Sequence, residues 1–499
     1  MSLSEYVSAY TEAALEGYIP RAYRELKVIH DNLWGTNVYY PHELILIDCP
    51  LFQRLRYITQ TGLAFLVYPS LNHSRFEHSL GMVTIASRIV AKLRTKYPTA
   101  IRELDLLDEL PTGKLFAELR MAALLHDIGH GFLSHVSEGI YKWHPDFREL
   151  KKEERFSHAK ASEIFTYLII TSDPFRKLFE TYVLPAVPKV ELDSIANLVM
   201  GKARPEEFFV AQIINGALDA DKVDYISRDA FYSGISTTID IDRLFNDLIL
   251  HRYPSGLNSL VLSGPIPLER ILFSKILLYT TIYYHQKVKA ADCMVEGLLE
   301  YVNETGNTLY GYEFKDPTDF LRITDNEFFS RRAPSKSDSY IQSVVDNLTS
   351  RRLLQRCLVL SRETLEDYES QVYFLNRLSK APPNLVRELR QKIMDEVGKK
   401  VSCSIHDIWV SLPEQPSLRE ASQTLALQPG ESQPVKINDI FPLDGWLRAF
   451  SNNKWRGYVF APENARSAVY EAAKKVLEDY GIRLNAKSSA YAHISVEAE

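Results

Sequence analysis

The dipeptide His126-Asp127 constrains this 499-residue chain more than any other feature. It stands in the segment FAELRMAALLHDIGHGFLSH at 116–135. The part before the dipeptide is mostly apolar, and the part after it is a glycine-rich turn with two further histidines. The apolar segment predicts a buried helix that ends in an imidazole and a carboxylate. Neighbouring nitrogen and oxygen ligands of this kind suit a borderline divalent metal.

Two other segments are expected to direct polar groups to the same point. Residues 75–93 read as a helix, and His78 lies on its apolar stripe. A third helix, from about 208 to 233, carries Asp221 on one face. Two imidazoles and two carboxylates balance a divalent charge and leave positions open for water and substrate oxygens. We therefore predict a metal site inside a helical bundle, with the ligands His78, His126, Asp127 and Asp221.

Composition predicts an ordinary soluble protein of two or three domains. Its hydrophobic content is 45% and its charged content 24%. The N-terminus is polar, and no apolar run approaches the roughly twenty residues that cross a membrane. Four scattered cysteines support neither a zinc knuckle nor a disulfide framework, which favours a cytoplasmic location. A net charge of −6 gives no overall footprint for nucleic acid, although binding of single strands stays open.

The order of patterns along the chain predicts a mainly α protein with three regions. Residues 1–330 are expected to form a helical core with an N-terminal extension, and residues 331–400 a helical connecting region. Residues 401–499 are expected to form a small α+β lobe. Within that lobe, residues 401–412 alternate like a strand, and residues 455–481 read as a strand, a turn and a helix.

Four sequence motifs resemble those of the HD-domain phosphohydrolases, and within them the deoxynucleoside triphosphate (dNTP) triphosphohydrolases. They are DCPLFQRLRYITQTG at 48–62, HSRFEHSLG at 73–81, LLHDIGHGFLSH at 124–135 and DADKVDYISRD at 219–229. The animal enzymes that join a sterile-alpha-motif domain to the HD domain are most similar, and we expect no such accessory domain here. The resemblance covers about residues 27–480, with its specific motifs before residue 290.

The resemblance implies roles for the polar residues around the predicted ligands. The metal would be Mn, Mg, Fe or Zn. The residues that match triphosphate contacts are Arg75, His130, His135, Lys222 and Tyr225. His158 would be a catalytic histidine, and Glu138 stands where the family has the aspartate that pairs with it. A histidine can act as general acid toward the leaving nucleoside oxygen.

The resemblance also implies how the sugar would be recognised. Gln60 and Asp229 match residues that read a 3′-hydroxyl, and Tyr284 matches a tyrosine that packs against C2′. Sites that pair with a hydroxyl discriminate strongly against analogues that lack it. One departure is Ile276, which falls where the relatives have a phosphate-binding arginine.

A regulatory nucleotide site is a further implication of the resemblance. The residues that match activator contacts are Lys27, Val28, Asp48, Gln53, Arg56 and Arg243. Aspartate can accept from the N1 and N2 donors of guanine, and arginine can donate to O6 and N7. GTP or dGTP would then bind between subunits of a homo-oligomer, a dimer or a tetramer. The alternative is that QRLRYI at 53–58 is only a structural amphipathic helix.

Together these features predict a metal-dependent enzyme that hydrolyses dNTPs to deoxynucleoside and tripolyphosphate. An HD phosphohydrolase that acts on an alarmone, a nucleoside monophosphate or a nucleic-acid end is the first alternative. A catalytically inactive nucleotide sensor is the second. The intact set of His130, His135, Lys222 and His158 argues against the second.

Overall fold

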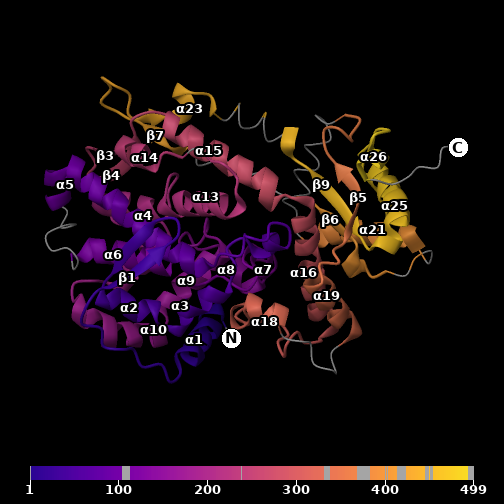
Figure 1. Cartoon of the computed structure of the whole chain (residues 1–499), viewed down its shortest axis with the longest axis horizontal. Helices are drawn as coiled ribbons and strands as arrows, with labels where there is room; N and C mark the ends of the chain where they lie inside the picture. Colours follow the sequence, from indigo (N-terminus) through magenta and orange to yellow (C-terminus); the bar gives the residue numbers. More distant parts are fainter. Residues whose placement is uncertain are drawn as a thin grey trace.

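The computed structural model describes residues 2–103, 113–237, 239–330, 338–367, 383–398, 401, 403–412, 423–443, 445, 449 and 453–492. Helices dominate this part of the chain, and the strands are short, so the predicted fold class is confirmed (Figure 1). None of the helices in these ranges combines the length and the apolar character that crossing a bilayer requires.

Most helices belong to one large body with a common hydrophobic core. Its helices are α1 (Leu3–Leu15), α2 (Pro41–Ile47), α3 (Pro50–Gln53), α4 (Arg75–Lys96), α5 (Pro98–Glu103), α6 (Lys114–Leu125), α7 (His135–Tyr141), α8 (Pro145–Leu150), α9 (Ala161–Thr171), α10 (Asp173–Leu178), α11 (Leu192–Val199), α12 (Phe208–Ile214), α13 (Ala220–Ser233), α14 (Ile241–Asp247), α15 (Ile266–Leu278), α16 (Gln286–Thr305), α17 (Asp319–Arg322), α18 (Asp325–Ser330) and α19 (Ser339–Thr349). An antiparallel hairpin, β1 (Lys27–Asp31) and β2 (Gly35–Tyr39), and a second sheet, β3 (Leu248–Arg252), β4 (Asn258–Leu262), β7 (Leu425–Ala426) and β8 (Val435–Lys436), complete it.

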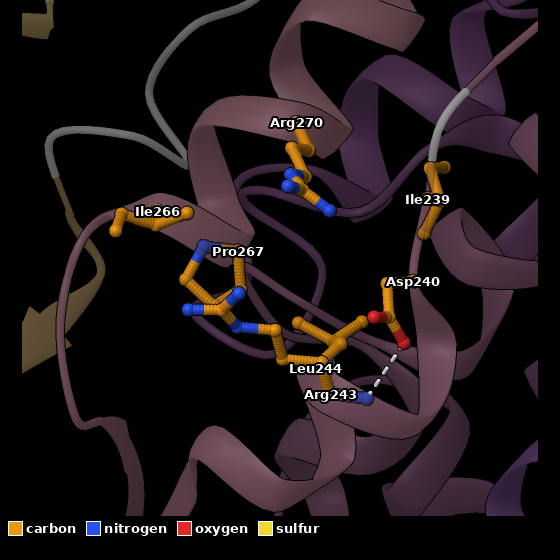
Figure 2. A pocket seen from close by; sticks show the side chains of 7 residues that line it. All are labelled: Ile239, Asp240, Arg243, Leu244, Ile266, Pro267 and Arg270. Atoms are coloured by element: carbon orange, nitrogen blue, oxygen red, sulfur yellow. Dashed lines mark hydrogen bonds between the residues drawn. The ribbon is translucent and has the colours of Figure 1, made fainter.

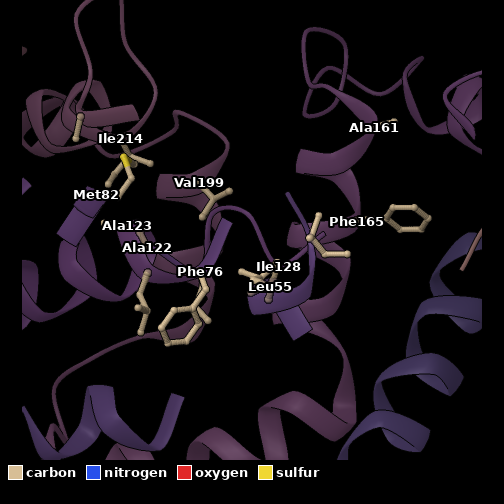
Figure 3. Close-up of a cluster of buried hydrophobic side chains, with 14 of the residues drawn as sticks. Leu55, Phe76, Met82, Ala122, Ala123, Ile128, Ala161, Phe165, Val199 and Ile214 are labelled. Carbon is tan, nitrogen blue, oxygen red and sulfur yellow. The ribbon is translucent and has the colours of Figure 1, made fainter. Parts of the chain in front are cut away.

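Helix α4 lies at the centre and packs against both α6 and α13. Its start is fixed by a capping box, in which Ser74 accepts from the N–H of Glu77 and the Glu77 carboxylate accepts from the N–H of Ser74. Buried apolar side chains from several of these helices interlock, among them Met82 of α4 and Ala122 of α6 (Figure 3). The expected helix over 75–93 is thus confirmed.

Two glycines allow backbones to approach closely around the site. A Cβ atom at Gly81 would lie 2.0 Å from Asp224 Oδ1, so α4 and α13 can meet here only through glycine. A Cβ atom at Gly129 would lie 2.3 Å from the carbonyl oxygen of Ser162, on α9. The turn after His126 therefore lies directly against α9.

The single helix expected from about 208 to 233 is wrong, because the structure has two helices, α12 and α13, separated by residues 215–219. Asn215 leaves the helical conformation, with φ −140° and ψ 77°. Asp219 then caps α13 by accepting from the N–H of Lys222 at 2.8 Å, and it also accepts from the N–H of Gly216 at 3.0 Å. The restart of the helix places Asp221 in the first turn of α13.

The C-terminal α+β lobe has a hydrophobic core of its own. Its antiparallel sheet has the order β5 (Gln355–Leu360), β9 (Gly457–Ala461), β6 (Trp409–Ser411), and its helices are α21 (Pro383–Val397), α25 (Arg466–Asp479) and α26 (Ser488–Ala492). Strand β5 and helix α21 precede residue 401, so the lobe draws on the region expected to be a helical connection. Parts of that region, 331–337, 368–382 and 399–400, lie outside the described residues. The lobe lies beside α16 and α19 (Figure 1).

Candidate active site

Three helix ends bring the predicted metal ligands together. His78 projects from the first turns of α4, His126 caps the end of α6, and Asp221 lies in the first turn of α13. The His78 Nε2 atom lies 3.1 Å from His126 Nε2 and 3.1 Å from Asp221 Oδ1. One ligand atom from each of the three residues lies within 4.8 Å of the other two. Metal–ligand bonds of about 2.1 Å fit atoms at this spacing, so the donor set suits a divalent ion.

The fourth predicted ligand, Asp127, is buried next to these three. Its Oδ1 lies 3.3 Å from His126 Nε2, and its Oδ2 lies 3.8 Å from His78 Nε2. Arg75 Nη1 donates to the same Oδ2 at 2.5 Å. Burial alone would raise the pKa of Asp127, but Arg75 and the surrounding histidines hold it well below its usual range. The carboxylate is therefore ionised and available to a cation.

Both histidine rings are oriented by a hydrogen bond at the nitrogen remote from the site. His78 Nδ1 lies 2.7 Å from Asp224 Oδ2, and His126 Nδ1 lies 2.8 Å from the carbonyl oxygen of Ala123. A proton at Nδ1 leaves Nε2 as the free lone pair, which is the form that binds a metal. Sequence reasoning missed Asp224. The only signal was its position three residues after Asp221, which cannot separate a supporting carboxylate from a ligand.

The turn that follows His126 is held by side chains from distant segments. Thr166 on α9 donates to the carbonyl oxygen of His126 at 2.9 Å and accepts from the N–H of Gly129 at 3.0 Å. Leu133 and Ser134 adopt positive φ values of 52° and 57°, which cost about 1 kcal/mol or more for residues other than glycine. Asp325 accepts from the N–H of Leu133 at 2.6 Å and so stabilises that conformation.

The predicted phosphate contacts surround this turn and the start of α13. Arg75 is buried, and besides Asp127 it donates to the hydroxyl of Ser134. Lys222 Nζ donates to the carbonyl oxygen of Gly216 at 2.8 Å and to Asp219 Oδ2 at 2.6 Å. Tyr225 is half-buried, one turn further along α13. Both cations are thus held by protein oxygens at the edge of the metal site.

A histidine–glutamate pair lies next to the metal ligands. His135 Nδ1 lies 3.0 Å from Glu138 Oε2, and Ser162 donates to Glu138 Oε1 from its N–H at 3.0 Å and its hydroxyl at 2.8 Å. Burial would raise the pKa of Glu138, but its hydrogen bond from His135 and the charge of nearby histidines hold it well below its usual value. His135 is 62% exposed at its side chain, so its outer edge is open to a substrate.

The other two predicted site histidines, His130 and His158, have different surroundings. His130 is buried, with Nε2 3.4 Å from Asp127 Oδ1, and burial together with Arg75 lowers its pKa well below the usual value. His158 is exposed. Within the described ranges, the hydrogen bonds of the Glu138 carboxylate go to His135 and Ser162. The structure therefore pairs Glu138 with His135, where the resemblance implies His158.

The predicted sugar contacts lie around Asp229, which is buried near the end of α13. His73 Nε2 lies 2.8 Å from Asp229 Oδ1, and the phenol of Tyr283 donates to Asp229 Oδ2. Gln60 joins this group through its N–H, which donates to the carbonyl oxygen of His73 at 3.0 Å. Tyr284 follows Tyr283 in the chain and is half-buried. Neither His73 nor Tyr283 was singled out in the sequence.

The predicted activator residues fall into two places. Asp48, Gln53 and Arg56 lie in the segment 48–56, and Arg56 Nε donates to Gln53 Oε1 at 2.7 Å. Lys27 and Val28 lie on β1, and Val28 is 58% exposed.

Arg243 lies elsewhere, in a pocket between α14 and the start of α15 (Figure 2). Arg270 lines the same pocket, as do the apolar side chains Leu244 and Ile266. Asp240 accepts from the backbone N–H of Arg243 at 3.0 Å. The pocket thus combines two guanidinium groups with apolar walls.

Comparison with protein families identifies the class of this protein. The HD domain matches residues 75–229, which contain the four predicted metal ligands, and the HD-associated region matches residues 239–486. The chain therefore belongs to the HD-domain family, as its motifs predicted. HD domains bind divalent metals, and the fold and the ligand set are those of a metal-dependent phosphohydrolase.

Individual relatives are similar to different extents. An uncharacterised protein of Methanocaldococcus jannaschii is 24% identical over 473 residues, 93% of this chain and 86% of that protein. Deoxynucleoside triphosphate triphosphohydrolase SAMHD1 of Bos taurus is 26% identical over 406 residues, 74% of this chain and 65% of the relative. The human protein of the same name is 28% identical over 330 residues, 61% of this chain. The chain spans half of the human protein and just under two thirds of the bovine one.

Proposed function

We propose that this protein hydrolyses dNTPs to deoxynucleoside and tripolyphosphate. The observation that carries the proposal is the chain of contacts that leads from the predicted ligand Asp127 through His130 to His135, which pairs with Glu138. A metal site, a proton donor and phosphate-binding cations are the three parts that attack at a nucleotide phosphate requires. The SAMHD1 relatives, which are named as dNTP triphosphohydrolases, support the choice of substrate.

The cations next to the site would bind the phosphate chain. A divalent ion held by the four ligands would supply Lewis-acid polarisation of the phosphate. Arg75 presents a planar fork and Lys222 a mobile point charge, and both suit phosphate oxygens. In the absence of substrate they are held by Asp127 and Asp219. Binding therefore exchanges these protein partners for phosphate oxygens, which keeps the charges balanced in both states.

His135 would protonate the leaving 5′-oxygen of the nucleoside. Glu138 holds Nδ1 of the ring, so Nε2 lies at the exposed edge, where it would present a proton to the leaving oxygen. Ser162 occupies the other oxygen of Glu138 with two hydrogen bonds and fixes its orientation. Transfer of the Nε2 proton would neutralise the 5′-alkoxide as its bond to the α-phosphorus breaks and an attacking water forms the new bond to that phosphorus, which leaves with the tripolyphosphate.

Guanine nucleotides would act as activators between subunits of a homo-oligomer. Asp48, Gln53 and Arg56 offer a carboxylate, an amide and a guanidinium within one short segment, outside the metal site. A ligand that bridges two copies stabilises the assembly through mass action. Val28 offers exposed apolar surface on β1, and the neighbouring Lys27 lies over the ring of Tyr23, whose hydroxyl donates to Asp48.

Product analysis tests the proposal. The protein is incubated with each dNTP and each ribonucleotide in the presence of Mn²⁺ or Mg²⁺, and the products are followed by phosphorus NMR and chromatography. Intact tripolyphosphate and deoxynucleoside are expected, and Asp221→Asn, which removes a ligand charge at constant shape, should form neither. Orthophosphate or pyrophosphate as the first product would instead favour a phosphohydrolase with another nucleotide substrate.

A further inference from the structure

Asp229 is a paired carboxylate among the predicted sugar contacts, and its two side-chain partners come from two separate segments. His73 approaches Oδ1 from the loop before α4, and Tyr283 donates to Oδ2 from the π-helical turn Tyr279–Tyr283 that follows α15. Asp229 itself is 2% exposed. Neither His73 nor Tyr283 belongs to the metal cluster or to the phosphate-binding cations.

Tyr283 is suited to act as a permanent donor. Burial and the neighbouring Asp229 raise the pKa of Tyr283 well above its ordinary value, so the phenol keeps its proton. A carboxylate oxygen has two lone pairs, and the bonds from His73 and Tyr283 use one on each oxygen. The remaining lone pair on each oxygen can accept from a ligand hydroxyl.

A second polar group in the same neighbourhood points to a ligand. Within the described part of the chain, Gln60 Oε1 is buried without a hydrogen-bond partner. An unpaired buried oxygen of this kind costs about 1–3 kcal/mol, so a group that supplies a hydrogen bond to it is favoured at this position. The backbone N–H of Gln60 donates to the carbonyl oxygen of His73, so the residue that carries the unpaired oxygen lies beside the partner of Asp229. A sugar hydroxyl is the partner that both acceptors fit.

We propose that Tyr283 is a specificity-determining residue of the sugar site. Its hydroxyl holds the Asp229 carboxylate in the orientation that accepts the substrate 3′-hydroxyl. The inference rests on the proposed function, because it concerns the same substrate. Tyr283 acts as a positioning residue through Asp229. His73 holds the opposite oxygen, so the two donors prevent the carboxylate from rotating. Preference for a 3′-hydroxyl thus depends on a tyrosine that lies next to Tyr284, the residue expected to pack against C2′.

The test compares dNTPs with 2′,3′-dideoxynucleotides in wild-type protein and in Tyr283→Phe. The substitution removes only the phenol oxygen and retains the ring. The ratio of kcat/KM for dNTP to that for dideoxynucleotide should fall about tenfold, because the contact with the 3′-hydroxyl weakens. Turnover of the dideoxynucleotide should stay within about twofold of wild type, since it lacks the hydroxyl that Asp229 reads.

Tyr68→Phe is the matched control. It removes an equivalent hydroxyl, which donates to the carbonyl oxygen of Thr281 in the same turn at 2.8 Å. This variant should keep the wild-type ratio. An unchanged ratio in Tyr283→Phe, or an equal loss with both substrates, would overturn the inference.

The outcome can be separated from failure of the proposed function. If wild-type protein hydrolyses no dNTP at all, the proposed function fails. The same comparison is then made by calorimetry, with deoxyguanosine and 2′,3′-dideoxyguanosine as probes of the Mn²⁺-loaded protein. Tyr283→Phe should then weaken binding of deoxyguanosine alone. Equal binding of both nucleosides by wild type and variant would overturn the inference about Tyr283.

Discussion

His78 and Asp224 are joined by a hydrogen bond of 2.7 Å between Nδ1 and Oδ2, at the point where α4 crosses α13. Gly81, one turn after His78, provides the space for this carboxylate. Asp224 is itself held by Arg228 at 2.9 Å and by the indole N–H of Trp34 at 2.5 Å. The ring that presents Nε2 to the metal is thus fixed by a buried polar network before any ion binds.

The first prediction concerns Asp224→Asn. The amide retains the shape of the carboxylate but weakens its hold on the His78 ring, so the affinity for Mn²⁺ should fall about 10- to 100-fold. Isothermal titration calorimetry with Mn²⁺ measures this affinity. Asp193→Asn is the control, because this exposed acid binds Arg176 on the surface. Unchanged affinity in Asp224→Asn would show that the hydrogen bond does not orient the ligand.

The second prediction concerns Glu138→Gln. Loss of the carboxylate that holds Nδ1 leaves the His135 ring poorly oriented for proton transfer, so kcat should fall by about 10²–10⁴ while metal content stays at the wild-type level. Glu163→Gln is the control, since Glu163 accepts from the backbone N–H of Lys160 at the start of the same helix as Ser162. A full rate in Glu138→Gln, or an equal loss in both variants, would remove the assigned role.

The third prediction concerns Glu118, which lies on α6 and accepts from the N–H of Glu191 and the hydroxyl of Ser194. Burial raises the pKa of Glu118 to about 7, although these two hydrogen bonds act to lower it. The folded state then binds the proton more tightly than the unfolded state, so stability is lost as pH rises from about 4.5 to 7. The contribution is on the order of 3 kcal/mol.

Glu118→Gln should remove that dependence, because the amide does not titrate. The free energies of unfolding of wild type and variant, measured by urea denaturation between pH 5 and 8, should diverge in favour of the variant toward pH 8. Parallel curves across this range would contradict the assignment.

The fourth prediction concerns Asp48→Asn and regulation. Activity and sedimentation coefficient of wild type should rise with GTP or dGTP, and Asp48→Asn should lose this response while it keeps the metal and its basal rate. The reason is that guanine N1–H and N2–H donors need a carboxylate partner, and Asp48 is not among the metal ligands. Equal mass and equal rates across a range of GTP in wild type would remove the regulatory claim and leave the catalytic one intact.

Much of the architecture could be predicted because local patterns carry it. The apolar stripe that holds His78 and the apolar segment before His126 both specify buried helices, and their polar residues then meet at the helix ends. The break between α12 and α13 was not predicted, because the side-chain bonds of Asp219 to Gly216 and Lys222 end one helix and start the next. The hydrophobic periodicity of a sequence does not reveal such a helix cap.

The partners of individual site residues depend on contacts over long distances in the chain. Glu138 lies three residues from His135, which is helical spacing, yet the resemblance favoured His158 as its partner. Tyr283 and Asp229 are 54 residues apart, and their contact depends on the packing of α13 against α15 and the turn after it. A single sequence offers no signal for such a pairing.

The most direct test of the central claim measures metal content and dNTP hydrolysis in the same preparations of wild type and Asp127→Ala. Asp127 is buried between Arg75 and the two histidine ligands, and its loss removes one ligand charge without touching Glu138. Elemental analysis should find a divalent metal in wild type, and the variant should lose the metal and tripolyphosphate formation together. Full metal content in Asp127→Ala, or hydrolysis that persists without metal, would contradict the account.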